Sequence, residues 1–204
     1  MHMKKTLLIS LVVIVMALLV SARWRSAADQ APPANTLAAA DTTIAVALSL
    51  EEMVNQSDLI AIGTCLETKS VWVDRSLVTL ATISVSETLK GTESTSLTVV
   101  LPGGVDANRK FPVAMSYPGA PRLTPGEDVF LFLNADVDYG NGYNVTGFSQ
   151  GKFSIVNDQD GEPMVSRDLT KMTLQDGKGV SRGRSNATPL ATFKTQVKGY
   201  LKKQ

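Results

Sequence analysis

Short strand patterns, separated by turn residues, follow one another along most of this chain. In residues 77–89, apolar side chains such as Leu77, Ala81 and Ile83 alternate with largely polar neighbours, as in a strand with one buried face. The segments between these strand patterns show little helical periodicity. We therefore expect a mainly β fold with strands at residues 60–66 (continuing through 73), 77–89, 96–101, 129–133 and 143–156.

Two of these strands suggest how the sheet is arranged. Residues 129–133 (VFLFL) are apolar on both faces, so other elements must cover each side. The long pattern at 143–156 contains Gly147 and Gly151, which suggest bulges or a sharp bend. Five short strands with glycine bends favour a closed or partly closed antiparallel barrel. A two-sheet β-sandwich is the alternative.

The sequence predicts one short helix before the strands and one helix after them. Ser49 and Glu52 form a capping box that begins a helix reaching about residue 56. Thr188 as N-cap and Pro189 at the first position begin an amphipathic C-terminal helix. We expect this helix to dock on the domain with its lysines in water, rather than to lie on an anionic membrane.

Part of the chain resembles a known group of domains. Residues 57–64 (SDLIAIGT), the alternating residues 77–85 and residues 87–91 (ETLKG) resemble the opening of netrin-like OB-fold domains, which include the tissue inhibitors of metalloproteinases. A similar layout, with Pro125-Gly126-Glu127 before an apolar strand, occurs in small exported bacterial proteins of unknown function. The resemblance spans residues 45–156 and implies an OB-like barrel. The inhibitors are rich in disulfides and present an amino-terminal cysteine to the protease zinc. This chain has one cysteine, so those inhibitory residues do not carry over.

The amino end predicts export. Lys4 and Lys5 precede an uncharged run at residues 6–22, and small residues follow it, as in a secretory signal peptide. Because positive charge beyond the apolar run disfavours translocation, Arg23 and Arg25 keep an uncleaved amino-terminal anchor as the alternative. We expect a periplasmic or extracellular protein that meets a membrane only through this segment, if the segment is retained.

Changes in composition divide the chain into five parts. The net charge that remains without the first part limits the kinds of partner. Residues 1–28 hold four basic and no acidic residues, so the remaining chain has 16 basic and 19 acidic residues and a net charge of −3. That balance excludes a nucleic-acid binder. The expected parts are a signal peptide or anchor (1–28), a flexible leader (29–43), a β-barrel domain (44–173), a polar linker (174–188) and the C-terminal helix (189–204).

Missing residue types exclude several reactions. The one histidine, His2, lies in the expected signal peptide, so the mature chain has no Ser–His–Asp triad, no Cys–His pair and no histidine zinc site. Cys65 cannot close an intrachain disulfide, and its apolar neighbours predict a small buried side chain. We expect no cofactor and no catalytic residues.

Three weaker patterns leave alternatives open. Ser149-Gln150-Gly151-Lys152 matches S-x-x-K, but it lies in a strand pattern and lacks the partner motifs of penicillin-recognising enzymes. A histidine-independent hydrolase could use carboxylates such as Glu127 and Asp128. A calcium-stabilised envelope protein could use two acidic turn clusters, although neither has the full calcium-loop spacing. These clusters are Asp136, Asp138 and Asn141, and Asp158, Asp160 and Glu162.

The segment after the third strand is the candidate binding site. In residues 99–105 (VVLPGGV) an apolar strand pattern ends at Pro102 and Gly103-Gly104. The residues that follow lack the spacing of a P-loop. Residues 102–125 hold five of the nine prolines, so the sequence predicts a long, stiffened loop over 103–127. Aromatic, Met and Arg side chains, which are enriched at interface centres, predict a non-enzymatic binding module for a protein or cell-envelope polymer, with protease inhibition as one version. The alternative is that Phe111, Met115 and Tyr117 cover an open barrel end. The candidate residues are Arg109, Lys110, Phe111, Met115, Tyr117 and Arg122.

Overall fold

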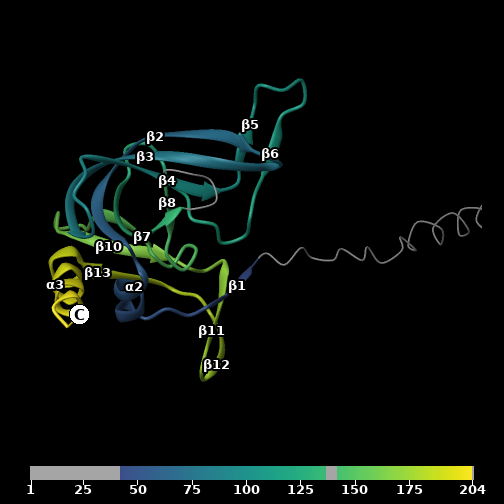
Figure 1. Cartoon of the computed structure of the whole chain (residues 1–204). Helices are drawn as coiled ribbons and strands as arrows, with labels where there is room; N and C mark the ends of the chain where they lie inside the picture. The colour runs from purple at the N-terminus through teal and green to yellow at the C-terminus, as the bar shows by residue number, and fades with distance from the viewer. Residues whose placement is uncertain (1–41, 137–141, 204) are drawn as a thin grey trace, which may run out of the picture. The chain divides into compact units, whose positions relative to one another are not determined.

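The computed structural model describes residues 42–136 and 142–203, a mainly β structure with two helices (Figure 1). The expected signal peptide and all of the expected leader before residue 42 lie outside the described residues. In chain order the elements are β1 (Thr43–Val46), α2 (Leu50–Gln56), β2 (Leu59–Val73), β3 (Ser76–Lys90), β4 (Ser96–Pro102), β5 (Gly104–Asp106), β6 (Val113–Met115), β7 (Asp128–Asp136), β8 (Gly142–Val145), β9 (Lys152–Asn157), β10 (Pro163–Asp168), β11 (Met172–Asp176), β12 (Gly179–Arg182), β13 (Ser185–Pro189) and α3 (Leu190–Leu201).

Five strands of the main sheet form a ring. The eight-stranded sheet has the order β13-β10-β9-β7-β2-β3-β4-β8, and a further pairing of β8 with β7 joins β7-β2-β3-β4-β8 in a circle (Figure 1). The expectation of a purely antiparallel sheet is wrong, because β4 and β8 pair in parallel. A parallel pair needs a long crossover, and here the chain passes through β5, β6 and β7 between the two strands. A three-stranded sheet β1-β11-β12 lies beside this one, and its β1–β11 pair is also parallel.

The pattern at 143–156 is two strands instead of one. Gly147 has φ 64°, and the Gly151 amide donates to the Thr146 carbonyl at 3.0 Å, so the chain turns sharply between β8 and β9. Both strands pair with β7, β8 near its end and β9 near its start. A Cβ at Gly151 would lie 2.9 Å from the Phe132 carbonyl oxygen, so this close approach requires glycine. The glycines did mark a bend, but the single strand was wrong.

Two other segments are more regular than their composition suggests. The expected linker at 174–188 holds the end of β11, all of β12 and most of β13, and β13 pairs with β10. The expected loop 103–127 contains the antiparallel hairpin β5–β6. In both segments most side chains are exposed, so backbone pairing forms the strands without the apolar alternation that sequence patterns detect.

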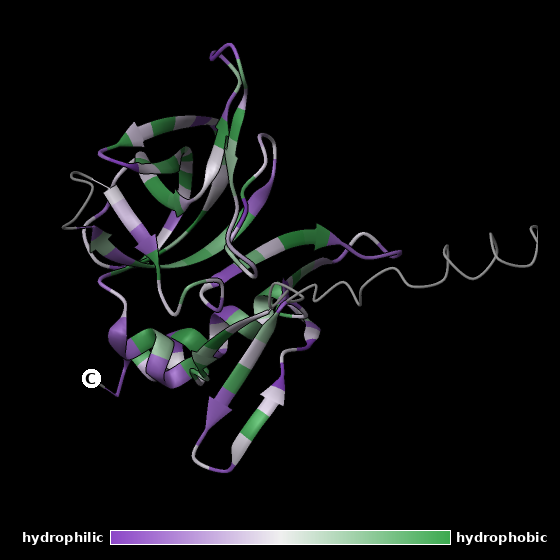
Figure 2. Ribbon diagram, turned by 90° about the vertical axis from the view of Figure 1, so that its right-hand side faces the viewer, coloured by the Kyte–Doolittle hydropathy of each residue, from purple (hydrophilic) through white to green (hydrophobic). Residues whose placement is uncertain are grey.

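Strand β7 divides the apolar side chains between two cores. Val129, Leu131 and Leu133 point into a cluster formed by the ring strands. Phe130 and Phe132 point the other way, into a cluster with residues of α2, α3, β9 and β10. The prediction that 129–133 is covered on both faces is confirmed. Figure 2 shows the corresponding mixture of hydrophobic and hydrophilic residues along the strands and around α3.

Both helices form near their predicted positions. Ser49 caps α2, and both hydrogen bonds of the capping box with Glu52 are present. Helix α3 begins at Leu190, with Pro189 rather than Thr188 as its N-cap, and buries Phe193 and Val197. None of the helices in residues 42–136 and 142–203 is long and apolar enough to cross a membrane.

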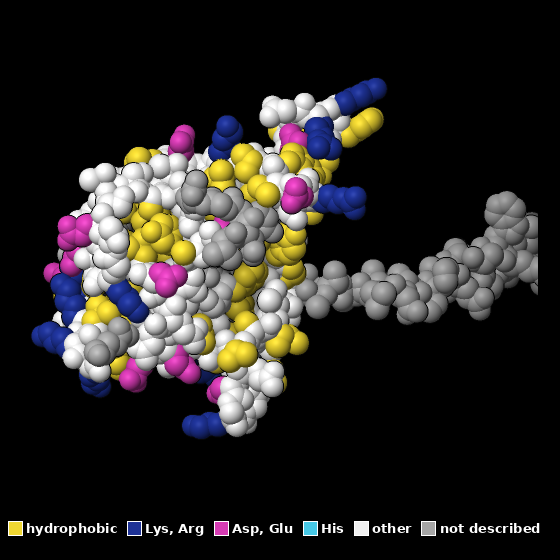
Figure 3. Space-filling view, viewed as in Figure 1, with side chains coloured by type: hydrophobic (Ala, Val, Ile, Leu, Met, Phe, Trp, Pro, Cys, Tyr) yellow, Lys and Arg dark blue, Asp and Glu magenta, His cyan; other side chains and the backbone are white. Residues whose placement is uncertain are grey.

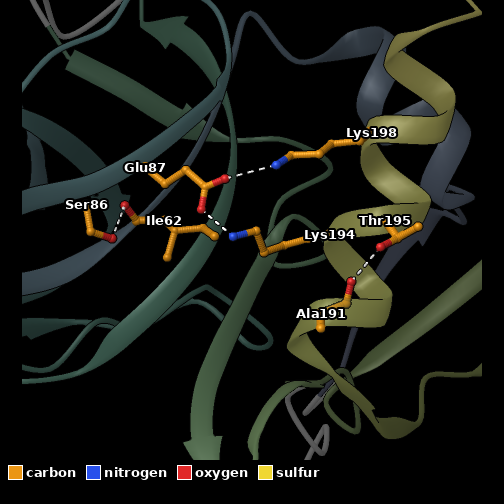
Figure 4. A network of polar contacts seen from close by, with 7 residues as sticks. All are labelled: Ile62, Ser86, Glu87, Ala191, Lys194, Thr195 and Lys198. Atoms are coloured by element: carbon orange, nitrogen blue, oxygen red, sulfur yellow. Dashed lines mark hydrogen bonds and ion pairs between the residues drawn. The ribbon is translucent and has the colours of Figure 1, made fainter.

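The outer side of α3 is held by charge. Lys194 and Lys198 both form ion pairs with Glu87 of β3, the second at 3.3 Å (Figure 4). The docked position of the helix is therefore as expected. Lys198 remains exposed, as expected, and Lys194 is partly covered; the sequence did not predict that Glu87 of β3 pairs with both.

Candidate functional site

The candidate loop starts from a fixed base on the β2–β3 hairpin. Thr79 Oγ1 donates to the Gly103 carbonyl at 2.8 Å, and the Val105 amide donates to Ser70 Oγ at 3.0 Å. Gly103 has φ 88°, and a Cβ there would lie 2.5 Å from the Met115 carbonyl oxygen. The turn that follows β4 therefore requires glycine at position 103. Strand β5 is joined to the β2–β3 hairpin by the hydrogen bond from Val105 to Ser70.

One carboxylate organises the lower part of the β5–β6 hairpin. The Trp72 indole N–H donates to Asp106 Oδ2 at 2.7 Å, and Arg109 Nε donates to the same oxygen at 2.9 Å. The Arg109 guanidinium lies 4.6 Å from the Trp72 ring centroid. The hydrogen bond from Trp72 is the main cause that lowers the pKa of Asp106, with smaller contributions from Asn108 and Arg109. Arg109 is therefore held in place, although it lies near the surface.

The hairpin tip projects into solvent. Lys110 and Phe111 are both exposed, Phe111 with 75% of its surface accessible. The Lys110 ammonium lies 5.7 Å from the Phe111 ring centroid. Figure 3 shows basic and hydrophobic side chains together on this projection, at the upper right. An aromatic side chain this exposed contributes little to the stability of its own chain.

Residues 116–124, which we call the strap, return from β6 towards the ring. The Ala120 amide donates to the Tyr117 carbonyl at 3.1 Å, and Thr43 Oγ1 donates to the Pro118 carbonyl. Pro121 and Leu123 are buried, and Leu123 belongs to the ring core. The strap is therefore fixed along its length, while Tyr117 and Arg122 stay exposed.

Three hollows surround the strap, with volumes of about 460, 310 and 360 Å³. Tyr117 and Pro121 line all three. The first lies towards β5 and β6 and includes Met115 and Arg122. The second is the most apolar and includes Val100, Val145 and Phe148. The third lies towards β9 and β10 and includes Arg122, Ser149, Lys152, Ser154 and Lys171.

A polar network forms part of the wall of the third hollow. The Lys152 ammonium donates to Glu127 and, at 2.8 Å, to Ser154 Oγ, while Ser154 Oγ donates to Glu127 at 2.7 Å. An ammonium engaged in this way has no lone pair with which to take a proton from the serine. The network holds β9 against the start of β7.

The other chemical alternatives are not assembled. The Ser149 hydroxyl lies 2.8 Å from Met172 Sδ, away from the Lys152 ammonium, so the S-x-x-K residues form no pair. Asp128 accepts a hydrogen bond from Thr64, while its neighbour Glu127 joins the Lys152 network. The two carboxylates therefore have separate partners.

Of the two acidic turn clusters, the one formed by Asp158, Asp160 and Glu162 lies wholly within the described residues and stabilises a turn. Asp158 Oδ1 accepts from the amides of Asp160 and Glu162, both at 2.9 Å, which closes the β9–β10 turn. Asp138 and Asn141 lie outside the described residues. Across residues 42–136 and 142–203, no three His, Cys, Asp or Glu side chains are grouped as metal ligands.

The six predicted site residues fall into three places. Arg109, Lys110 and Phe111 lie at or below the hairpin tip, and Tyr117 and Arg122 line the hollows. Met115 folds back towards β3, where the Leu77 amide donates to its sulfur at 3.2 Å. The covering role therefore applies to Met115, while Phe111 covers nothing on its own chain.

Two residues of the candidate site were not identified from the sequence. Trp72 orients Arg109 through Asp106, but 34 residues separate the indole from that carboxylate, so no local spacing connects them. Phe148 lines the second hollow and has φ 66°, a strained backbone for a bulky residue. Its position directly after Gly147 was the available signal.

The lone thiol lies inside the ring core. Cys65 is fully buried, as predicted, and burial is the main cause that raises its pKa, followed by the charge of Glu127. A thiol with a raised pKa is a poor nucleophile.

Comparisons of the chain with protein-family models, with curated proteins and with solved structures each find no match.

Proposed function

We propose that this chain is an exported, non-enzymatic binding module that contacts a protein or cell-envelope polymer through residues 103–127. One observation carries the proposal: the strap is fixed along its length, yet Tyr117 on it lines three hollows at once. A partner that enters any of these hollows meets Tyr117 and Pro121.

Preorganisation favours binding by this segment. Side chains that are already held lose little freedom when a partner orders them, so less of the interaction energy is lost. Arg109 is held by Asp106 and Trp72, and the strap is held by Pro121 and Leu123. Tyr and Arg are also the residue types that most often dominate interface energies.

Charge indicates the kind of partner. Arg109, Lys110 and Arg122 are basic residues on a mature chain whose expected net charge is −3. Asp106 offsets one of them. An acidic or polar partner would gain from this local field, and its binding would weaken as salt is added.

The ring supports an OB-like interpretation of the fold. It has five strands, and the parallel pair of β4 with β8 joins the third ring strand along the chain to the last. We interpret it as a small OB-like barrel that carries the binding loop, in line with the netrin-like resemblance. Protease inhibition remains one version of this function, supported by the resemblance alone.

The test is a triple substitution, Phe111→Ala with Tyr117→Ala and Arg122→Ala. First, affinity capture from the envelope or culture fluid of the native host, followed by mass spectrometry, identifies the partner. We expect the triple variant to lose capture while its circular dichroism and melting change little, because all three side chains are exposed.

The matched control is Leu66→Ala with Val156→Ala and Arg75→Ala, three exposed residues outside the loop, which should keep capture. If the first variant unfolds, its residues cover the core and the binding interpretation is wrong. If it folds and still captures the partner, the site lies elsewhere, and the C-terminal helix is the next candidate.

A further inference from the structure

The outer face of the small sheet β1-β11-β12 is apolar although nothing in the described residues covers it. Val46, Gln175 and Val180 lie in one row across the three strands, and Ile44, Thr173 and Arg182 lie in the next. Ile44, Val46 and Val180 are 66–70% exposed. Because directly paired residues share a face, these three aliphatic side chains lie on the same face, with Thr173 and Gln175 of β11 between β1 and β12.

The opposite face of this sheet is packed in the ordinary way. Met172 is fully buried, and Ala45 and Leu174 are half-buried. The usual alternation of buried and exposed residues is present, but three of its outward positions, Ile44, Val46 and Val180, are aliphatic, beside the polar Thr173, Gln175 and Arg182. An exposed apolar cluster rimmed by polar residues marks an interaction surface.

Basic residues lie on this face and next to its strands in the chain: Arg182 is in the second row, Lys178 is in the β11–β12 turn and Arg184 follows β12. From Gly177 to the end of the chain the sequence has seven Lys and Arg residues and no Asp or Glu. Lys194 and Lys198 are paired with Glu87, but Lys178, Arg182 and Arg184 form no ion pair with any residue in the described part of the chain. Asp176 is the one acidic residue within β1, β11 and β12. Figure 3 shows hydrophobic side chains and a basic one over this part of the molecule, at the lower right.

We propose that the face with Ile44, Val46 and Val180, together with the basic residues Lys178, Arg182 and Arg184 on and beside β12, docks on an anionic lipid surface. This surface lies on other elements than the loop 103–127, and the proposal does not depend on the function of that loop.

Two features favour a lipid surface over other occupants. Aliphatic side chains that protrude from a sheet enter the boundary between headgroups and acyl chains, where basic residues beside them meet anionic headgroups. A hydrophilic polyanion would use the basic residues but would leave the three aliphatic side chains in water. A second copy of this chain would place Lys178, Arg182 and Arg184 against like charges, unless the copies were offset.

The test places a fluorescent probe on the face itself. Val180→Cys is labelled with an environment-sensitive dye, and the buried Cys65 stays unlabelled in the native protein. Vesicles contain either phosphatidylcholine alone or equal parts of phosphatidylcholine and phosphatidylglycerol. We expect the emission of the dye at position 180 to shift to the blue only when the vesicles are anionic. A dye at Thr92→Cys in the β3–β4 turn should show no such shift. A probe on the face reports docking there even if the amino-terminal segment also binds the membrane.

Matched variants separate the apolar and charged contributions. Val46→Ser with Val180→Ser should weaken anionic-vesicle partitioning of the unlabelled protein about tenfold or more, and Leu66→Ser with Val156→Ser should leave it unchanged. Lys178→Gln with Arg184→Gln should weaken it as well, and Lys69→Gln with Arg75→Gln should not.

Three results would overturn the proposal. One is that Val46→Ser with Val180→Ser and Leu66→Ser with Val156→Ser partition equally onto anionic vesicles. Another is a dye at position 180 that is already shielded without vesicles, which would mean that a second copy or another part of the chain covers the face. The third is a dimer in analytical ultracentrifugation that Val46→Ser with Val180→Ser dissociates.

Discussion

Single residues show how the surroundings set chemical character in this protein. Cys65 lies at an irregular point of β2, where the pairing with β3 shifts register between Cys65 and Glu67. Its carbonyl accepts from the Gly126 amide at 2.7 Å, and its amide donates to the Glu127 carbonyl at 2.9 Å. The thiol is therefore enclosed between β2 and the turn before β7, with the Glu127 charge nearby.

We predict that Cys65 is buried and chemically idle. Cys65→Ala should lower the free energy of unfolding by about 1 kcal/mol, the cost of a small cavity, and leave partner capture intact. Because burial raises the pKa of the thiol, labelling of the native protein should stay slow even at mildly alkaline pH.

Stopped-flow labelling with a thiol reagent measures the reaction rate of Cys65. The protein unfolded in guanidinium serves as the control, because its thiol should react at the rate of a free cysteine. Rapid labelling of the native protein would show that the ring opens at this point.

Helix α3 illustrates how an element is held in two different ways. Phe193 contacts the rings of Phe130, Phe132 and Phe153, with centroids 4.7–6.2 Å apart. On its other side, Lys194 and Lys198 converge on Glu87 (Figure 4). The aromatic cluster supplies most of the attraction because it is desolvated, while the ion pairs fix the rotation of the helix.

We predict that Glu87→Gln weakens this docking and makes stability less sensitive to acid. The two lysines lower the pKa of Glu87, chiefly through the hydrogen bond from Lys194. A carboxyl with a lowered folded-state pKa stabilises the protein above its ordinary pKa, and that contribution disappears as pH falls through the lowered value.

At neutral pH the variant should be less stable by about 0.5–1 kcal/mol, a small figure because solvent reaches these charges. Urea unfolding as a function of pH checks this, with Glu93→Gln in the exposed β3–β4 turn as the control. A difference between wild type and Glu87→Gln that persists in strong acid would mean that the ion pairs are not its cause.

Considered as a whole, the described part of the chain is two cores joined by β7, and the two proposed binding surfaces lie outside them. Leu131 and Phe132 are neighbours in sequence, yet they belong to different cores. The candidate loop leaves the ring at one place, and the apolar face of β1-β11-β12 is formed by strands outside the main sheet. The exposed side chains of both surfaces belong to neither core, so we expect that substituting them leaves the protein folded.

We predict that this molecule acts outside the cytoplasm after loss of residues 1–22 or 1–28. The basic start, the apolar run and the small residues that follow it carry this prediction. Intact-mass measurement of the protein recovered after export should give one of the two shortened chains. An intact Met1 in a membrane fraction would establish an uncleaved anchor instead.

Local sequence was sufficient wherever one segment alone holds the relevant physics. The Ser49–Glu52 capping box predicted α2, and alternation predicted β3. The apolar run at 129–133 required cover on both faces, which the two cores provide. In each case the signal depends on residues within a few positions of one another, through hydrogen bonds near a helix end or the two-residue period of a strand.

Contacts between distant segments decided the rest. The parallel pairing of β4 with β8, the pairing of the polar strand β13 with β10, and the Trp72–Asp106 contact all join residues that no short window contains. Residue types predicted an interface for 103–127, but tertiary packing separated Met115, turned back against β3, from Tyr117 and Phe111, which face solvent. The backbone hydrogen bonds that pair exposed strands are common to every residue type. Side-chain patterns therefore predict which segments are buried far better than which exposed segments meet.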